Sequence, residues 1–292
     1  MSATLDRKTE AAPLCGVFAA VYRNIVNDRG LLPSMPDIAL RIRAAMNNPS
    51  YNVSSVARVV QTDSAVSAHL IRMANSALYR TEVPITDLRR AIARLGVPVC
   101  RNIVTAYTMR AMFVTDSKAL TNLMRERWRE SALTSAVASV LASHCRGFSA
   151  DRAMLAGLLQ DIGSLPLIRA MESRIKPGDD LGRLEATLRT YTPKTGVVLL
   201  QHWGFDDDII ETARAGNNWH REIGDKPDLA DVVTIARLHA NVGTPRMHDC
   251  PRINEVPAYR RLELGELGPR DSLAILDCAQ KEVSEVLSSL GV

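Results

Sequence analysis

The sequence is poor in aromatic residues, has no long apolar run and contains no close pair of cysteines. Aromatic side chains make up only 4% of the 292 residues, so leucine, valine, isoleucine and alanine must fill the core. The five cysteines are widely scattered and odd in number, which favours reduced thiols over a disulfide framework. No apolar stretch reaches the roughly 18 residues that a membrane helix requires. These absences predict a cytoplasmic protein without a membrane span.

The chain also carries little net charge for its length. Its 36 basic and 32 acidic residues leave a net charge of +4, which is typical of a solvated surface. Nucleic-acid-binding domains concentrate basic residues on one face, so we do not expect nucleic acid as the partner. The sequence has no nucleophile-elbow, phosphate-loop or dinucleotide fingerprint. These absences argue against the enzyme classes that local motifs identify.

Apolar residues follow helical spacing along nearly the whole chain. Leu133, Val137 and Val140, for example, recur at intervals of four and three, which is typical of a helix with one buried face. No segment alternates as a half-buried strand does. We therefore expect an all-α fold. The predicted helices cover residues 13–28, 36–46, 53–62, 65–75, 86–96, 98–113, 118–145, 149–161, 181–190, 193–203, 207–215, 229–242 and 269–290.

Six short motifs occur in a fixed order along the chain. They are residues 32–36 (LPSMP), Asp63 followed by residues 70–77 (LIRMANSA), residues 86–96 (TDLRRAIARLG), 128–131 (WRES), 156–163 (AGLLQDIG) and 203–205 (WGF). Together they resemble the HDOD domain, the HD-related output domain of bacterial signalling proteins. Each motif is short, but their shared order extends over about residues 25–240.

The resemblance implies a multi-helix orthogonal bundle like that of HD domains. It implies kinship with HD metallophosphohydrolases but no established catalysis. The expected domains are residues 1–28, a helix that belongs to the first subdomain; residues 29–114, the N-terminal subdomain; residues 115–245, the HD-like subdomain; and residues 246–292, a C-terminal extension.

The resemblance also indicates where the metal ligands of an HD enzyme would fall. They would lie near Glu130, at residues 160–161, near Asn217 and near Arg237. The sequence keeps an acidic residue only at Glu130 and Asp161. Gln160 offers a neutral amide, and Arg237 would repel a cation. We therefore expect no catalytic residue, no bound metal and no cofactor.

The segment around Asp161 can be interpreted in three ways. Asp161 could be a structural carboxylate that pairs with an arginine, which we favour, part of a remnant pocket for a small ligand, or part of a working metal site. The segment reads as the end of a helix closed by Gly163. His202, which precedes Trp203, is included as a residue that could face the same pocket.

A second candidate region is a set of basic and amide residues in the first half of the chain. Its members are Arg72, Asn75, Arg80, Arg89, Arg90 and Arg94. Arg90 and Arg94 are four residues apart and share one helical face. Such a face could bind an acidic partner, or it could be ordinary solvated surface. Asn75 could instead hold the following loop by bonding to its backbone.

We expect a non-catalytic signal-transduction module that acts through protein–protein contacts. Whether a small ligand at the junction of its halves switches it is left open. The expected partners are signalling proteins, with response regulators and components of cyclic-dinucleotide pathways as the classes considered. A metal-dependent phosphohydrolase of nucleotides or cyclic dinucleotides is the alternative enzyme reading. A nucleic-acid-binding regulator is the third, and it would require a continuous basic surface and salt-sensitive binding.

Overall fold

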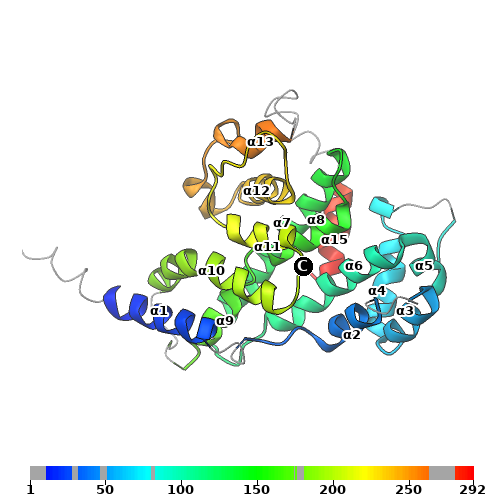
Figure 1. The fold of residues 1–292 in the computed structure, drawn as a ribbon, viewed down its shortest axis with the longest axis horizontal. Coiled ribbons are helices and arrows are strands. Elements are labelled where there is room, and N and C mark those ends of the chain that lie inside the picture. The colour runs from blue at the N-terminus through cyan, green and yellow to red at the C-terminus, as the bar shows by residue number, and fades with distance from the viewer. Residues whose placement is uncertain are drawn as a thin grey trace, which may run out of the picture.

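The computed structural model describes residues 11–27, 32–46, 51–79, 83–173, 175, 181–262 and 280–292. Within these ranges the chain forms α-helices and short 3₁₀ helices but no strand, which confirms the expected all-α fold (Figure 1). Among the described helices, none is both long and apolar enough to cross a membrane.

A first group of helices occupies one side of the molecule, on the right in Figure 1. It contains α2 (Asp37–Met46), α3 (Val53–Val60), α4 (Ser64–Ala74), η2 (Ala77–Tyr79), α5 (Leu88–Leu95), α6 (Val97–Met109) and η3 (Arg110–Met112). Asp63 begins α4 by accepting hydrogen bonds from the backbone amides of Ala65 and Val66. The apolar helix faces meet in a core in which Leu70 and Ile92 are fully buried.

A second group is built around the long helix α7 (Thr121–His144). Its other members are α8 (Ala150–Leu159), α9 (Ser164–Arg169), α10 (Gly182–His202), α11 (Asp207–Ala215) and α12 (Leu229–Ala240). Helix α7 packs against α8 and α12. A Cβ atom at Gly157 would lie 2.9 Å from the Cα atom of Ser135, so glycine permits the close contact of α8 with α7. The predicted domain boundary at residues 114–115 falls between η3 and α7 and stays a proposal.

The packing of α1 and the start of α8 differ from the predictions. Helix α1 (Ala11–Asn27) packs mainly against α10 and α9, whereas residues 1–28 were assigned to the first subdomain (Figure 1). Ser149, the first residue of the predicted helix 149–161, lies just before α8; it makes no capping hydrogen bond to the backbone, and its hydroxyl donates to the carboxylate of Asp151. The packing of α1 and the hydrogen bond of Ser149 both involve residues that helical periodicity does not identify.

The segment after α8 also differs. The sequence predicts a helix that runs to Asp161 and is closed by Gly163, but α8 ends at Leu159 and α9 begins at Ser164. Gly163 has helical angles, φ −63° and ψ −14°, so it is not a left-handed helix end. A Cβ atom on Gly163 would lie 2.2 Å from the carbonyl oxygen of Thr192 in α10. Glycine is needed here for close backbone contact.

Helix α10 is continuous, whereas the sequence predicts two helices, residues 181–190 and 193–203. Pro193 lies inside it. A proline cannot donate to the carbonyl four residues earlier, which is that of Arg189. The side-chain amide of Asn217 donates to this carbonyl at 3.2 Å, so the group keeps a partner. This contact from a distant residue helps the helix to continue through the proline.

The C-terminal extension touches both groups. Its described helices are η4 (Pro245–Asp249), η5 (Ile253–Glu255), α13 (Pro257–Arg261) and α15 (Gln280–Leu290). Helix α15 packs against α7 and also contacts α4 and α6, and the carboxylate of Glu285 accepts a hydrogen bond from the amide of Ala77 at 2.7 Å. The rest of the helix predicted over residues 269–290 lies outside the described residues.

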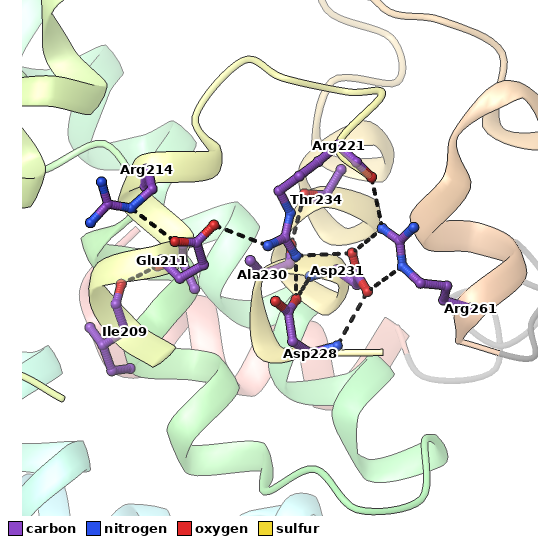
Figure 2. Close-up of polar contacts among 10 residues, drawn as sticks. Ile209, Glu211, Arg214, Arg221, Asp228, Ala230, Asp231, Thr234 and Arg261 are labelled. Carbon is purple, nitrogen blue, oxygen red and sulfur yellow. Dashed lines mark hydrogen bonds and ion pairs between the residues drawn. The ribbon is translucent and has the colours of Figure 1, made fainter. Parts of the chain in front are cut away.

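A buried charge network fastens α13 to the second group (Figure 2). Asp231, in the first turn of α12, has a side chain only 1% exposed. It accepts hydrogen bonds from Arg261 at 2.7 Å and from Arg221 at 3.1 Å. Arg221 also contacts Asp228 and Glu211. One carboxylate therefore joins the loop before α12 to the extension.

Candidate functional site

The structure brings most of the predicted site residues to two adjoining cavities. The first, of about 80 Å³, lies between α7, α10, α12 and η4, and the second, of about 110 Å³, lies between α7, the end of α8 and α12. Asp161 and Arg237 line both cavities. Asn217 lines the first, and Glu130 and Gln160 line the second.

His202 is the exception. It is exposed at the end of α10 and lines neither cavity. The neighbouring Trp203 is buried and its indole donates to the carbonyl oxygen of Pro33 at 2.9 Å. Because Trp203 faces the core at the end of the helix, His202 faces solvent. The prediction that His202 could share the pocket is thus corrected.

Arg127, which the sequence analysis missed, lies at the centre of the acidic residues. Its side chain is 8% exposed, and its NH1 atom is 3.5 Å from a carboxylate oxygen of Glu130 and 3.5 Å from one of Asp161. Its NH2 atom is 3.9 Å from Glu185. A guanidinium therefore sits among three carboxylates as their shared cation.

A second arginine approaches Glu130 from outside the HD-like helices. Arg246, in η4, lies 2.9 Å from the same carboxylate oxygen of Glu130 that faces Arg127. Burial raises the pKa of Glu130, and the two arginines oppose this shift by favouring the charged form. The carboxylate is thus held by two guanidiniums.

Arg237 is held by neutral groups. Its guanidinium donates to the carbonyl oxygen of Gly216 and, at 2.5 Å, to the side-chain oxygen of Asn217. It also lies over the ring of Trp219, with 5.2 Å between the guanidinium carbon and the ring centroid. Burial lowers the pKa of Arg237. Asn217 thus links Arg237 to the proline-containing turn of α10.

These side chains do not fit a divalent metal. Metal-assisted phosphate hydrolysis needs imidazoles and carboxylates that converge on the ion. In the described part of the chain, no group of three or more His, Cys, Asp or Glu side chains could hold one. Glu130 and Asp161 already face Arg127, and Gln160 supplies only an amide. The other carboxylates that line the first cavity, those of Glu185 and Asp249, also face arginines.

Four arginines of the second candidate region lie on two helices, α4 and α5, which pack against each other. Arg89, Arg90 and Arg94 are exposed on α5, and Arg72 is exposed on α4. Arg80 lies outside the described residues.

Asn75 bonds to backbone. Its side-chain nitrogen donates to the carbonyl oxygens of Ile71 and Ile85, at 2.9 and 2.7 Å, and its oxygen accepts from the amide of Ile85 at 2.8 Å. These bonds hold the end of α4 to the segment before α5. Asn75 therefore holds the following loop by bonding to its backbone, which is the second of the two roles considered for it.

Sequence reasoning could have found part of the arginine arrangement. Arg127 precedes Glu130 by three residues on one predicted helix, which places both on the same face. Glu185 and Arg246 lie far away in sequence and carry no local signal. Their contribution depends on how α10 and η4 pack against α7.

Comparison with known proteins identifies the same family that the sequence motifs resemble. The sequence profile of the HDOD domain matches residues 32–219. An uncharacterised protein from Treponema pallidum (strain Nichols) is 23% identical over 231 residues, which are 71% of this chain and 42% of that protein. This chain thus spans less than half of that relative's length.

Solved structures share the fold. A candidate metal-dependent phosphohydrolase from Shewanella amazonensis SB2B matches with a TM-score of 0.78 and 22% identity, covering 96% of this chain and 99% of the other. An HDOD domain protein of unknown function from Geobacter sulfurreducens gives 0.62 and 21%, covering 93% and 97%. A candidate signal transduction protein from Marinobacter aquaeolei VT8 gives 0.60 and 18%, covering 100% and 68%. The profile match covers more than half of the chain, and the protein therefore belongs to the HDOD domain family.

Proposed function

We propose that this protein is a non-catalytic regulatory module of bacterial signal transduction that acts through protein–protein contacts. The observation that carries the proposal is the position of Arg127. Its guanidinium lies among Glu130, Asp161 and Glu185, where the resemblance to HD enzymes places the metal. An internal cation there competes with a divalent ion for the same oxygens and repels the ion itself.

The signalling role is supported by family membership and by the fold shared with the Marinobacter protein, which is described as a candidate signal transduction protein. Fold alone does not determine function, because unrelated activities occur on one scaffold. The residues at the site therefore carry the argument against catalysis. The residues on the surface must then carry the signal.

Phosphate-ester hydrolysis tests the catalytic half of the proposal. We expect no release of nitrophenol from p-nitrophenyl phosphate or bis(p-nitrophenyl) phosphate above the buffer rate with Mn²⁺, Mg²⁺ or Fe²⁺ present. The Asp161→Asn variant should behave as the wild type does, because Asp161 pairs with Arg127 and has no metal to hold. Metal-dependent turnover that disappears in Asp161→Asn would contradict the proposal.

Charge reversal on α5 tests the contact half. Arg90 and Arg94 are exposed and four residues apart, so they present two positive charges to a partner with an acidic surface. With a partner captured from a host extract, identified and purified, the Arg90→Glu/Arg94→Glu variant should bind at least about tenfold more weakly, because reversed charges repel.

The matched control for this reversal is Arg58→Glu/Arg260→Glu, which makes the same change in net charge at exposed arginines of α3 and α13. Its affinity should equal that of the wild type. Equal loss in both variants would indicate a general charge effect, and no loss in either would remove α5 from the contact surface.

A further inference from the structure

The first cavity has a charged wall in which arginines outnumber carboxylates by four to three. It is lined by Arg127, Arg189, Arg237 and Arg246, together with three acidic residues, Asp161, Glu185 and Asp249. Arg189 and Asp249, which pair at 2.9 Å, are 51% and 58% exposed and so lie at the solvent end. Arg127, 8% exposed, lies at the inner end. The cavity therefore leads from solvent to a buried guanidinium.

Arg237 is the arginine of this cavity that makes no ion pair among the described residues, whereas Arg127, Arg189 and Arg246 each make one or more. Among the described residues, no carboxylate oxygen lies within ion-pair distance of its guanidinium, and its bonded partners are Gly216 and Asn217. Asp161 and Glu130 act on it from beyond that distance, so the charge of this half-buried guanidinium is compensated only in part. An anion that enters the cavity would supply the missing counter-charge.

Arg127 adds a donor without an acceptor. Its Nε atom is buried and makes no hydrogen bond within the described residues. Its ion pairs, at 3.5–3.9 Å, are longer than charged hydrogen bonds of about 2.8 Å. Buried donors in native proteins nearly always have partners, so this arrangement indicates a group that completes it.

We propose that this cavity binds the phosphate group of a small phosphorylated molecule, with Arg237 and Arg246 as its main ligands. The inference rests on the proposed non-catalytic function and assigns its switching ligand. A cavity of about 80 Å³ has room for a phosphate group, while the rest of the molecule extends past the Arg189–Asp249 pair. Guanidinium groups suit this role because their planar forks match phosphate oxygens.

The acidic residues of the cavity set a second condition on the ligand. Asp161 and Glu185 repel a bare anion but accept hydrogen bonds from hydroxyl groups. A molecule that carries both a phosphate and hydroxyl donors, such as a nucleoside monophosphate, satisfies both kinds of group. Inorganic phosphate carries the first feature and only a weak form of the second. The ester should therefore bind more tightly.

Calorimetric titration with inorganic phosphate and with adenosine 5′-monophosphate tests this proposal. We expect the wild type to bind the monophosphate more tightly than free phosphate. Arg237→Gln and Arg246→Gln should each weaken binding by at least about tenfold, since each removes a charged hydrogen bond. Arg214→Gln is the control, because Arg214 pairs with Glu211 at 2.9 Å, as Arg246 does with Glu130, but lines neither cavity.

The possible results separate the proposals. No binding of either probe up to about 10 mM, or equal affinity in all three variants, would overturn the phosphate site. If Arg237→Gln fails to fold, the Arg246→Gln result decides, because that side chain is 29% exposed. Phosphorus NMR of the same samples addresses the other claim. Conversion of the monophosphate to free phosphate would contradict the non-catalytic function, whereas binding without conversion supports both.

Discussion

Replacing Gly163 with alanine is expected to destabilise the protein by at least about 3 kcal/mol. The new Cβ atom would lie 2.2 Å from the carbonyl oxygen of Thr192 and 2.3 Å from the backbone nitrogen of Gly196. Both neighbours are backbone atoms of α10, so no side chain can rotate away. The helices must separate, and the loss should appear as a fall of about 10 °C in melting temperature.

Gly16→Ala is the matched control for this change. Gly16 lies in α1, and a Cβ atom there would meet nothing within 4 Å. Alanine is the better helix former by about 1 kcal/mol, so this variant should be as stable as the wild type or slightly more stable. Equal melting temperatures for Gly163→Ala and the wild type would show that α9 and α10 are not in close backbone contact.

Replacing Asp231 with asparagine should also destabilise the protein, by about 3 kcal/mol in the free energy of unfolding. The side chain keeps its shape but loses the charge that Arg221 and Arg261 share. Arg261, whose side chain is 7% exposed, would lose the one ion pair it makes among the described residues, while Arg221, 9% exposed, would keep Asp228 and Glu211 (Figure 2). Chemical denaturation measures the loss.

Asp249→Asn provides the comparison, because it removes a pair of similar length in a different environment. Arg189 and Asp249 lie 2.9 Å apart with side chains more than half exposed. Water screens such a pair, so its loss should cost less than about 1 kcal/mol. If both variants lose equally little, the network at Asp231 does not fasten the extension.

The fold could be predicted from the sequence where the information is local. Helical spacing predicted most of the described helices, and the absence of alternation predicted that there are no strands among them. The predicted break in α10 was wrong because a proline usually ends a helix, whereas Asn217 supplies the missing donor from 28 residues away. Gly163 was misread as a helix end because close backbone contact depends on α10.

The candidate site, too, could be predicted only in the part that local sequence motifs describe. The resemblance identified Glu130, Asp161 and Arg237 by position, and all three line the second cavity. It did not identify Arg127 as their central cation, nor Arg246 as a partner of Glu130. A motif identifies the residues that stand at the positions of the metal ligands of HD enzymes. Which side chain lies between them depends on how the helices pack.

The claim that a guanidinium stands where a metal would bind is tested most directly by a Mn²⁺ titration of the purified, metal-stripped wild-type protein, followed by calorimetry. We expect no saturable binding, because Arg127 already faces Glu130, Asp161 and Glu185. Binding of one or two ions per chain at micromolar affinity, abolished by Asp161→Asn, would contradict it.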